Sequence, residues 1–256
     1  MSDFTGRLRR LPDDTVAALS FFSRLPVRTP TDIFDLSRIA GAWPLAGLLI
    51  AVGPAAIVVI NGWLGIPVTV TAFLAIAAGI AMTGALHEDG LADTFDGLGG
   101  RRKNQRLAIM RDSRLGTFGA LALVLVLLVK GSALATLTAH PSRAALALFG
   151  AAMVSRALAI WHWSATSPAR LEGMAFDAGK PDTAAMQIGL LLGALGALVL
   201  LIVFGFAGLL GLALAALAIG FFSPLVKRRF GGHTGDTIGA AQQIAETLLF
   251  VGLSSV

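Results

Sequence analysis

The sequence predicts an all-α integral membrane protein, a polytopic helical bundle of about six to seven transmembrane helices. Of its 256 residues, 55% are hydrophobic and only 14% are charged, and the mean hydropathy is +0.78. Several apolar stretches reach the roughly 20 residues that a helix needs to cross a bilayer core about 30 Å thick. These stretches are continuous, whereas a membrane β-barrel would show short strands of alternating polarity.

Two regions differ in composition. Residues 1–40 form an N-terminal arm rich in Asp and Arg, in which only residues 16–22 are apolar. We expect this arm to be a cytoplasmic or interfacial amphipathic segment without a cleavable signal peptide. We expect residues 41–256 to form a transmembrane catalytic domain. Cysteine is absent, which excludes disulfides, thiolate metal sites and a cysteine nucleophile.

Seven apolar spans are predicted, and the last of them is the least regular. It carries Gln242, Gln243 and Glu246, so it could cross the membrane, lie in the interface or be a buried helix with a polar face. The spans cover residues 41–62, 66–86, 117–139, 143–163, 185–204, 205–224 and 238–254.

The distribution of basic residues predicts the orientation. Arg and Lys gather in the N-terminal arm and in the loops 87–116, 164–184 and 226–236, while the connections near 63–65, 140–142 and 205 carry almost no charge. Because basic residues mark the cytoplasmic side, we expect a multi-pass protein of the inner membrane with its N-terminus and active-site loops in the cytoplasm.

An acidic cluster, "HEDGLADTFDG" at residues 87–97, follows the second span directly. Asp89, Asp93 and Asp96 are spaced i, i+4 and i+7, so a helix that continues past Leu86 would place them on one face. Three like charges on one face are tolerable around a hard divalent cation, and Mg²⁺ prefers a few carboxylates, waters and substrate phosphate. The alternative is a solvated loop of turn residues, which explains the glycines but not the helical phase.

Two further inner loops carry residues suited to phosphate chemistry. "MRDSRLGTFG" places Arg111 and Arg114 around Asp112, just before a helix start at Thr117 where backbone N–H groups favour anions. "GGHTGDTIGA" contains His233 and Asp236, and either Asp236 or Thr237 could instead cap the last helix.

Basic residues inside spans also suggest function, because their burial is costly. Arg156 lies about two turns from the cytoplasmic end of its span, within reach of a phosphate site. Lys130 lies deeper, either near the outer side or paired within the bundle. His162, between Trp161 and Trp163, is expected in an aromatic interface belt rather than in catalysis.

The three loop motifs, in this order and together with "FFSRLPV" and "WPLAGLLI", resemble the cobalamin synthase family, also called adenosylcobinamide-GDP ribazoletransferases. The resemblance runs from about residue 17 to about residue 250. It implies a membrane enzyme that transfers the adenosylcobinamide-phosphate group of adenosylcobinamide-GDP to α-ribazole or its 5′-phosphate and releases GMP, with Mg²⁺ as cofactor.

The resemblance also implies roles for individual residues. Asp89, Asp93 and Asp96 would hold one or two Mg²⁺ ions. Substrate phosphate would be bound by positively charged or hydroxyl side chains, namely Arg111, Arg114, Arg156, Lys130 and Thr117. The general base would be one of four residues that the sequence does not rank, namely Asp96, Asp112, His233 and Asp236. Direct in-line transfer is expected.

Two other functions are compatible with the composition. A CDP-alcohol-type lipid phosphotransferase would also bind a metal ion through spaced aspartates. The motif of that family has an arginine shortly after the first "DG" and a longer interval before the last two aspartates, and "DGLADTFDG" lacks both. A transporter with a cytoplasmic cation site would bind nearer the membrane midplane.

The expected partners are the two substrates and the lipid bilayer, with no nucleic acid. Small residues at 189–198 permit close helix packing within a chain or in a homo-oligomer.

Overall fold

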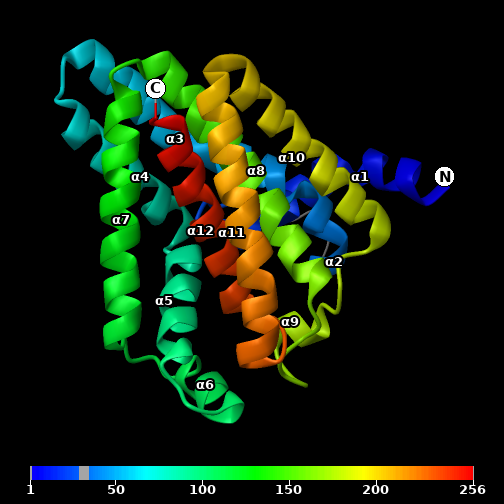
Figure 1. Ribbon diagram of the computed structural model, residues 1–256. Coiled ribbons are helices and arrows are strands. Elements are labelled where there is room, and N and C mark those ends of the chain that lie inside the picture. Colours follow the sequence, from blue (N-terminus) through cyan, green and yellow to red (C-terminus); the bar gives the residue numbers. More distant parts are fainter. Residues whose placement is uncertain (1, 29–34, 256) are drawn as a thin grey trace.

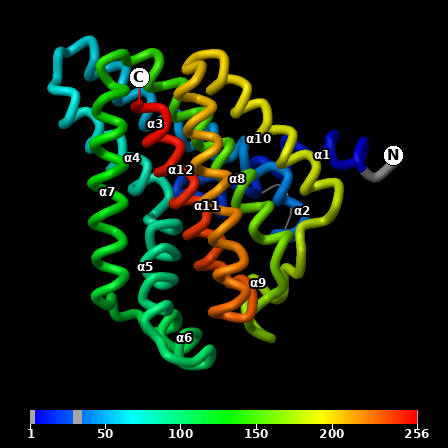
Figure 2. The backbone as a smooth tube through the Cα atoms, viewed as in Figure 1, coloured from blue at the N-terminus to red at the C-terminus, as the bar shows by residue number. Residues whose placement is uncertain are grey.

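The computed structural model describes residues 2–28 and 35–255. Within these ranges the regular secondary structure is helical, apart from one isolated β-bridge between Pro168 and His233. Figures 1 and 2 show the bundle. Its elements are α1 (Ser2–Phe22), α2 (Leu36–Ile39), the 3-10 turn η1 (Ala40–Ala42), α3 (Trp43–Leu64), α4 (Val68–Thr83), α5 (Leu86–Leu98), α6 (Lys103–Ile109), α7 (Thr117–Thr138), α8 (Pro141–Ala165), α9 (Met174–Asp177), α10 (Thr183–Phe204), α11 (Phe206–Phe230) and α12 (Gly235–Leu253).

Five helical segments of the described chain are long and apolar enough to cross a membrane: Leu36–Leu64, α7, α8, α10 and α11. The pair α4 and α5 makes a sixth candidate if both helices belong to one span. This arrangement confirms the predicted fold class, an all-α polytopic membrane protein.

The second predicted span, residues 66–86, ends in a break, and the helix that continues past Leu86 is a separate element, α5. The helix breaks at Gly84 and Ala85, whose φ angles are +64° and +61°, and α5 leaves α4 at an angle of 90°. Left-handed conformations are routine for glycine but strained for alanine, so the surrounding structure must hold this turn. Because α5 is itself helical, Asp89, Asp93 and Asp96 keep their helical phase.

The connections separate into two ends of the bundle. At one end, short turns join α3 to α4, α7 to α8 and α10 to α11. These turns touch, since Thr138 Oγ1 donates to the Val68 carbonyl at 3.2 Å and Arg143 donates to the Val203 carbonyl at 3.2 Å. The opposite end, here called the polar end, carries residues 99–116, 166–182 and 231–234, including α6 and α9 (Figure 1).

Helices α8 and α12 form the centre of the bundle. Helix α12 packs against α5, α7, α8 and α11, and its Gln242, Gln243 and Thr247 are buried. It is not among the candidate membrane spans of the described chain. Of the three possibilities for the last apolar segment, the structure therefore supports the buried helix with a polar face.

The N-terminal arm contains a helix that joins the core. Ala17, Ala18 and Phe22 of α1 are buried, and Asp14 forms an ion pair with Arg38 at 3.3 Å. Residues 29–34 of the arm lie outside the described part of the chain. The last turns of α1 are thus part of the bundle, whereas an interfacial helix would lie on its surface.

Candidate active site

A cavity of about 350 Å³ opens at the polar end, with walls from α1, α3, α5, α8, α9 and the start of α12. We call it the large cavity, to distinguish it from a smaller inner cavity behind it. Its polar lining brings together residues from three distant parts of the sequence: His87 and Asp89, then Arg156, Arg170 and Glu172, then His233, Thr234 and Asp236. Two of the predicted motifs, residues 87–97 and 231–240, therefore meet in one cavity.

Close packing of α5 against the start of α12 creates this meeting point. A Cβ atom on Gly90 would lie 2.7 Å from the carbonyl oxygen of Asp236, so only glycine allows the two helices to approach so closely. The Asp236 carboxylate accepts a hydrogen bond from Thr234 Oγ1 at 3.1 Å. Asp93 lies within electrostatic range of Asp89, Asp236, Asp96 and Arg170.

Asp96 is engaged differently from the other two aspartates. Its Oδ2 accepts the backbone N–H of Gly116 at 2.7 Å, and its Oδ1 accepts that of Gly119 at 2.8 Å. Both donors belong to the first turn of α7, where unpaired N–H groups and the helix dipole favour a carboxylate. Asp96 therefore anchors the start of α7, a role that the sequence did not reveal.

The arrangement of the carboxylates of Asp89, Asp93 and Asp236 decides how a metal ion could be held. Within the described residues, no group of three His, Asp or Glu side chains converges closely enough to hold a metal ion on protein ligands alone. Mg²⁺ commonly uses only one or two carboxylates and fills its other positions with water and substrate phosphate. Asp89 and Asp93, with Asp236 nearby, meet that looser requirement.

The motif at residues 109–120 lies at the polar end but does not line the large cavity. Arg114 pairs with Asp112 at 2.6 Å, and these hydrogen bonds lower the pKa of the exposed Asp112 carboxyl to about 2. Arg111 pairs with Glu172 at 2.5 Å and lines an adjoining groove that shares Arg170 with the large cavity. Thr117 is the exposed first residue of α7.

Two arginines border the large cavity. Arg156 is 4% exposed, donates to the Ala152 carbonyl of its own helix at 3.2 Å, and leaves its Nε without a partner. Arg170 donates to the Leu107 carbonyl at 2.9 Å and lies within electrostatic range of Asp236 and Asp93. Sequence reasoning identified Arg156 but treated Arg170 only as a topology marker, since nothing local distinguishes it from other loop arginines.

His233 is held by the turn that closes the polar end. Its backbone pairs with Ser167 and Ala169, each at 2.8 Å, and its Nδ1 lies 3.0 Å from Thr166 Oγ1. Because Thr166 Oγ1 donates to the His162 carbonyl at 2.9 Å, it is placed to accept the His233 Nδ1 proton. Burial lowers the pKa of His233 to about 4, so the ring is neutral at pH 7.

Two smaller expectations were wrong. His162 is fully buried, with Nδ1 2.8 Å from Ser223 Oγ, so it belongs to the core and not to an interface belt. The cap of α12 is Thr234, which forms a capping box with Thr237, and not Asp236 or Thr237. Asp236 sits one residue into the helix and faces the large cavity instead.

Aromatic side chains also line the large cavity. Trp43 of α3 stacks on Trp163 of α8 with ring centroids 5.2 Å apart, and Phe22 of α1 stacks on His87 at 5.5 Å. Phe176 of α9 borders the same cavity and is 41% exposed. These side chains are here called the aromatic wall (Phe22, Trp43, Trp163 and Phe176). It adjoins the charged groups, since the Arg156 guanidinium lies 5.9 Å from the centre of the Phe22 ring.

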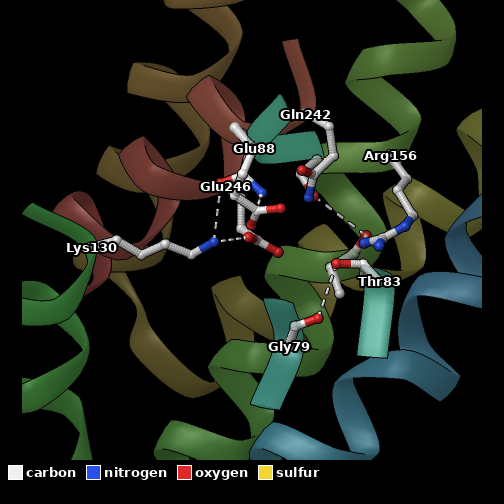
Figure 3. Close-up of polar contacts among 10 residues, drawn as sticks. Gly79, Thr83, Glu88, Lys130, Arg156, Gln242 and Glu246 are labelled. Carbon is white, nitrogen blue, oxygen red and sulfur yellow. Dashed lines mark hydrogen bonds and ion pairs between the residues drawn. The ribbon is translucent and has the colours of Figure 1, made fainter. Parts of the chain in front are cut away.

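A second, inner cavity of about 70 Å³ lies behind the first and shares His87, Arg156 and Gln242 with it. Figure 3 shows Lys130, Glu246 and Glu88 on one side of this space and Arg156 and Gln242 on the other. Lys130 forms an ion pair with Glu246 and does not line the large cavity. Of the two placements expected for Lys130, the structure supports pairing within the bundle.

Comparisons with known proteins agree on one family. The family model described as cobalamin-5-phosphate synthase matches residues 14–254. The adenosylcobinamide-GDP ribazoletransferase of Rhizobium etli (strain CIAT 652) is 44% identical over 253 residues, which cover 94% of this chain and 96% of that protein. The protein of the same description from Sinorhizobium medicae (strain WSM419) is 43% identical over 258 residues, 96% and 98% of the two chains. No solved structure matches.

Proposed function

The chain belongs to the cobalamin-5-phosphate synthase family, and on that premise we propose how its large cavity carries out the ribazoletransferase reaction. The observation that carries the proposal is the joining of Asp89, Asp236, Arg156 and Arg170 in one cavity that also has an aromatic wall. A cavity with charged and aromatic parts suits one substrate that reacts at a phosphate and another that carries a flat heteroaromatic ring.

The reaction transfers the adenosylcobinamide-phosphate group of adenosylcobinamide-GDP to α-ribazole or its 5′-phosphate. The acceptor hydroxyl oxygen forms a new bond to the phosphorus that bears the cobinamide. The bond from that phosphorus to the bridging oxygen breaks, and GMP leaves with the bond's electron pair. The hydroxyl proton passes to a base, so positioning and electrostatic stabilisation account for most of the catalysis.

Asp89 and Asp93 are the proposed Mg²⁺ ligands. Their carboxylates lie on one face of α5, and Asp89 borders the large cavity, where substrate phosphate and water would complete the coordination. A bound Mg²⁺ would supply stabilisation of negative charge on the transferred phosphoryl group and on GMP. Asp96 remains part of the site through its hold on α7, which keeps the next helix in register with α5.

The diphosphate is proposed to lie against Arg156 and Arg170. Guanidinium groups bind phosphate with paired hydrogen bonds, and Arg156 has a donor without a partner. Arg111 is placed to assist at the mouth of the cavity through the adjoining groove. Arg114 and Thr117 do not line the large cavity, and we propose that they affect the reaction only by shaping the polar-end loops.

Asp236 is the proposed proton acceptor. It borders the large cavity, and Thr234 fixes the orientation of its carboxylate. Asp112 suits this role less, because its pKa of about 2 makes it a weak base and it lies outside the cavity. His233 stays neutral and, with Nδ1 directed at Thr166, orders the loop that carries Asp236.

The aromatic wall is the proposed site for the benzimidazole ring of the acceptor. Offset or edge-on contacts between aromatic rings contribute beyond the area they bury. We also propose that the polar end faces the cytoplasm in the inner membrane, as the basic residues of the three polar-end loops indicate. A nucleotide-activated substrate would then reach the cavity from the compartment in which such compounds are made.

Turnover by the purified protein in detergent tests the proposal. We expect release of GMP and formation of a cobalamin product from adenosylcobinamide-GDP and α-ribazole 5′-phosphate, with activity lost in EDTA and restored by Mg²⁺. Full activity in EDTA would contradict the metal assignment but not the reaction. No product with Mg²⁺ would overturn the reaction, and a CDP-alcohol donor would then be the next substrate to assay.

A further inference from the structure

The position of α5 needs an explanation, because the helix that carries Asp89 and Asp93 is not a continuation of its neighbour. The break at Gly84 and Ala85 turns the chain by 90°, so the direction of α4 does not determine where α5 lies. Side-chain contacts to other helices must hold α5 against α12, where the approach of Gly90 to Asp236 leaves no room for a shift inward.

A chain of buried polar contacts joins α5 to α12 and α7 next to the proposed metal ligands. Glu88, adjacent to Asp89 in sequence, accepts a hydrogen bond from Gln243 Nε2 at 3.0 Å. The Oε1 of the same Gln243 accepts from Lys130 Nζ at 3.3 Å, and Lys130 forms an ion pair with Glu246 (Figure 3). One glutamine amide thus links a carboxylate of α5 to an ammonium group of α7.

The energetics of this network favour a role in positioning. Lys130 is 8% exposed and sits in a span, where desolvation of a charge is costly. A buried ion pair usually adds little stability compared with apolar residues of the same volume, but it can fix one arrangement among several. The network reaches α5 from α12 and, through α12, from α7. Contacts from these two helices oppose both rotation and sliding of α5.

We infer that Glu88, Gln243, Lys130 and Glu246 are positioning residues that hold α5 so that Asp89 and Asp93 present their carboxylates to the large cavity beside Asp236. The inference rests on the proposed function of that cavity. None of the four side chains lines the large cavity, so they act through the placement of α5 and not through contact with substrate.

Gln243→Met is the decisive variant, because it removes the central amide at similar volume and leaves Lys130 and Glu246 paired. We expect kcat to fall about 10- to 100-fold, as small misplacement of reacting groups commonly costs this much. The Mg²⁺ concentration for half-maximal activity should rise, while KM for α-ribazole 5′-phosphate stays unchanged. Glu88→Gln, which can still accept the hydrogen bond, should retain activity that Glu88→Leu loses.

Amide hydrogen exchange gives a readout that needs neither metal nor substrate. Peptides that cover residues 86–98 should exchange faster in Gln243→Met than in the parent protein, while peptides of α8 and α10 remain unchanged. The matched control is Thr247→Val, a buried position of α12 whose hydroxyl has no partner. It should leave both exchange and kcat at parent values.

Parent-like kcat together with parent-like exchange of α5 in Gln243→Met would overturn the inference. The double variant Lys130→Met/Glu246→Gln, which removes one charge of each sign, should reproduce the loss of kcat if the inference holds. If the parent protein showed no turnover, the proposed function would fail, whereas faster exchange of α5 in Gln243→Met would still support its positioning by the network.

Discussion

The large cavity and the inner cavity share His87, Arg156 and Gln242, yet charged groups are partnered differently in the two. In the inner cavity Lys130 is matched by Glu246 and linked through Gln243 to Glu88. Arg156 borders both cavities: its Nε has no hydrogen-bond partner, and Glu246 and Glu88 lie within its electrostatic range. Next to the large cavity, Asp93 is surrounded mainly by other carboxylates, those of Asp236, Asp89 and Asp96. Matched charges fix structure, whereas unmatched charges are ready to bind ions and phosphates of opposite sign.

Removing a carboxylate from the large cavity should have the largest effect. We expect Asp89→Asn to lower kcat about 100-fold or more, because charge stabilisation of the transferred phosphoryl group is lost. The rate of GMP release at saturating Mg²⁺ measures this. Asp112→Asn changes an exposed carboxylate outside the cavity, and its kcat should stay within about twofold of the parent value. Equal losses of kcat in both variants would contradict a special role for the carboxylates at the cavity.

Arg156 tests whether the unmatched donor serves the substrate. Arg156→Gln should raise KM for adenosylcobinamide-GDP about tenfold or more, since a hydrogen bond to a charged group is lost. Arg156→Lys should recover only part of this, because lysine cannot form paired hydrogen bonds. Arg143→Gln, at the end with short connections, is the control, and a similar rise in its KM would argue against a specific role for Arg156.

Gly90→Ala probes the contact between α5 and α12 that builds the cavity. The added Cβ would meet the Asp236 carbonyl at 2.7 Å, so we expect the free energy of unfolding to fall by about 1–3 kcal/mol. Thermal unfolding in detergent measures the change. Gly220→Ala, where nothing lies within 4 Å, should be neutral or stabilising by up to about 1 kcal/mol, and the same loss at both positions would refute the packing argument.

The aromatic wall should affect the acceptor substrate alone. Phe176→Ala is expected to raise KM for α-ribazole 5′-phosphate by about two- to tenfold, because the binding energy of one aromatic contact is lost. KM for adenosylcobinamide-GDP should stay unchanged. Phe221→Ala, which alters an exposed ring on α11, should change neither constant. A rise in the KM of the donor would instead place the donor against this wall.

The smallest expected effect is a dependence of stability on pH that comes from His233. Its pKa falls from 6.5 to about 4 on folding, so the unfolded chain takes up a proton that the folded protein excludes between these values. Stability from this group is therefore full above pH 6.5 and is lost as the pH falls towards 4. His233→Gln should flatten the Tm profile in this window, whereas His140→Gln, at an exposed position, should leave it unchanged.

The sequence predicted the helices and the phase of the three aspartates, because apolar length and helical spacing are local properties. It missed the break after α4, since Gly84 suggests a turn but nothing marks Ala85 for a left-handed conformation. The partners of Asp96 lie 20 and 23 residues away, and those of Lys130 more than 110, so only the folded chain reveals them. Arg170 joins the site for the same reason.

The size of the large cavity limits how the donor can be handled. A volume of about 350 Å³ is at the lower end for a drug-sized ligand, and a corrin macrocycle with its amide side chains is far larger. Under the proposed function, the phosphate-bearing tail of the donor enters this cavity and most of the macrocycle lies outside it. From this placement we expect discrimination among corrinoids to depend chiefly on the tail, and little on the metal at the centre of the corrin or on its upper ligand.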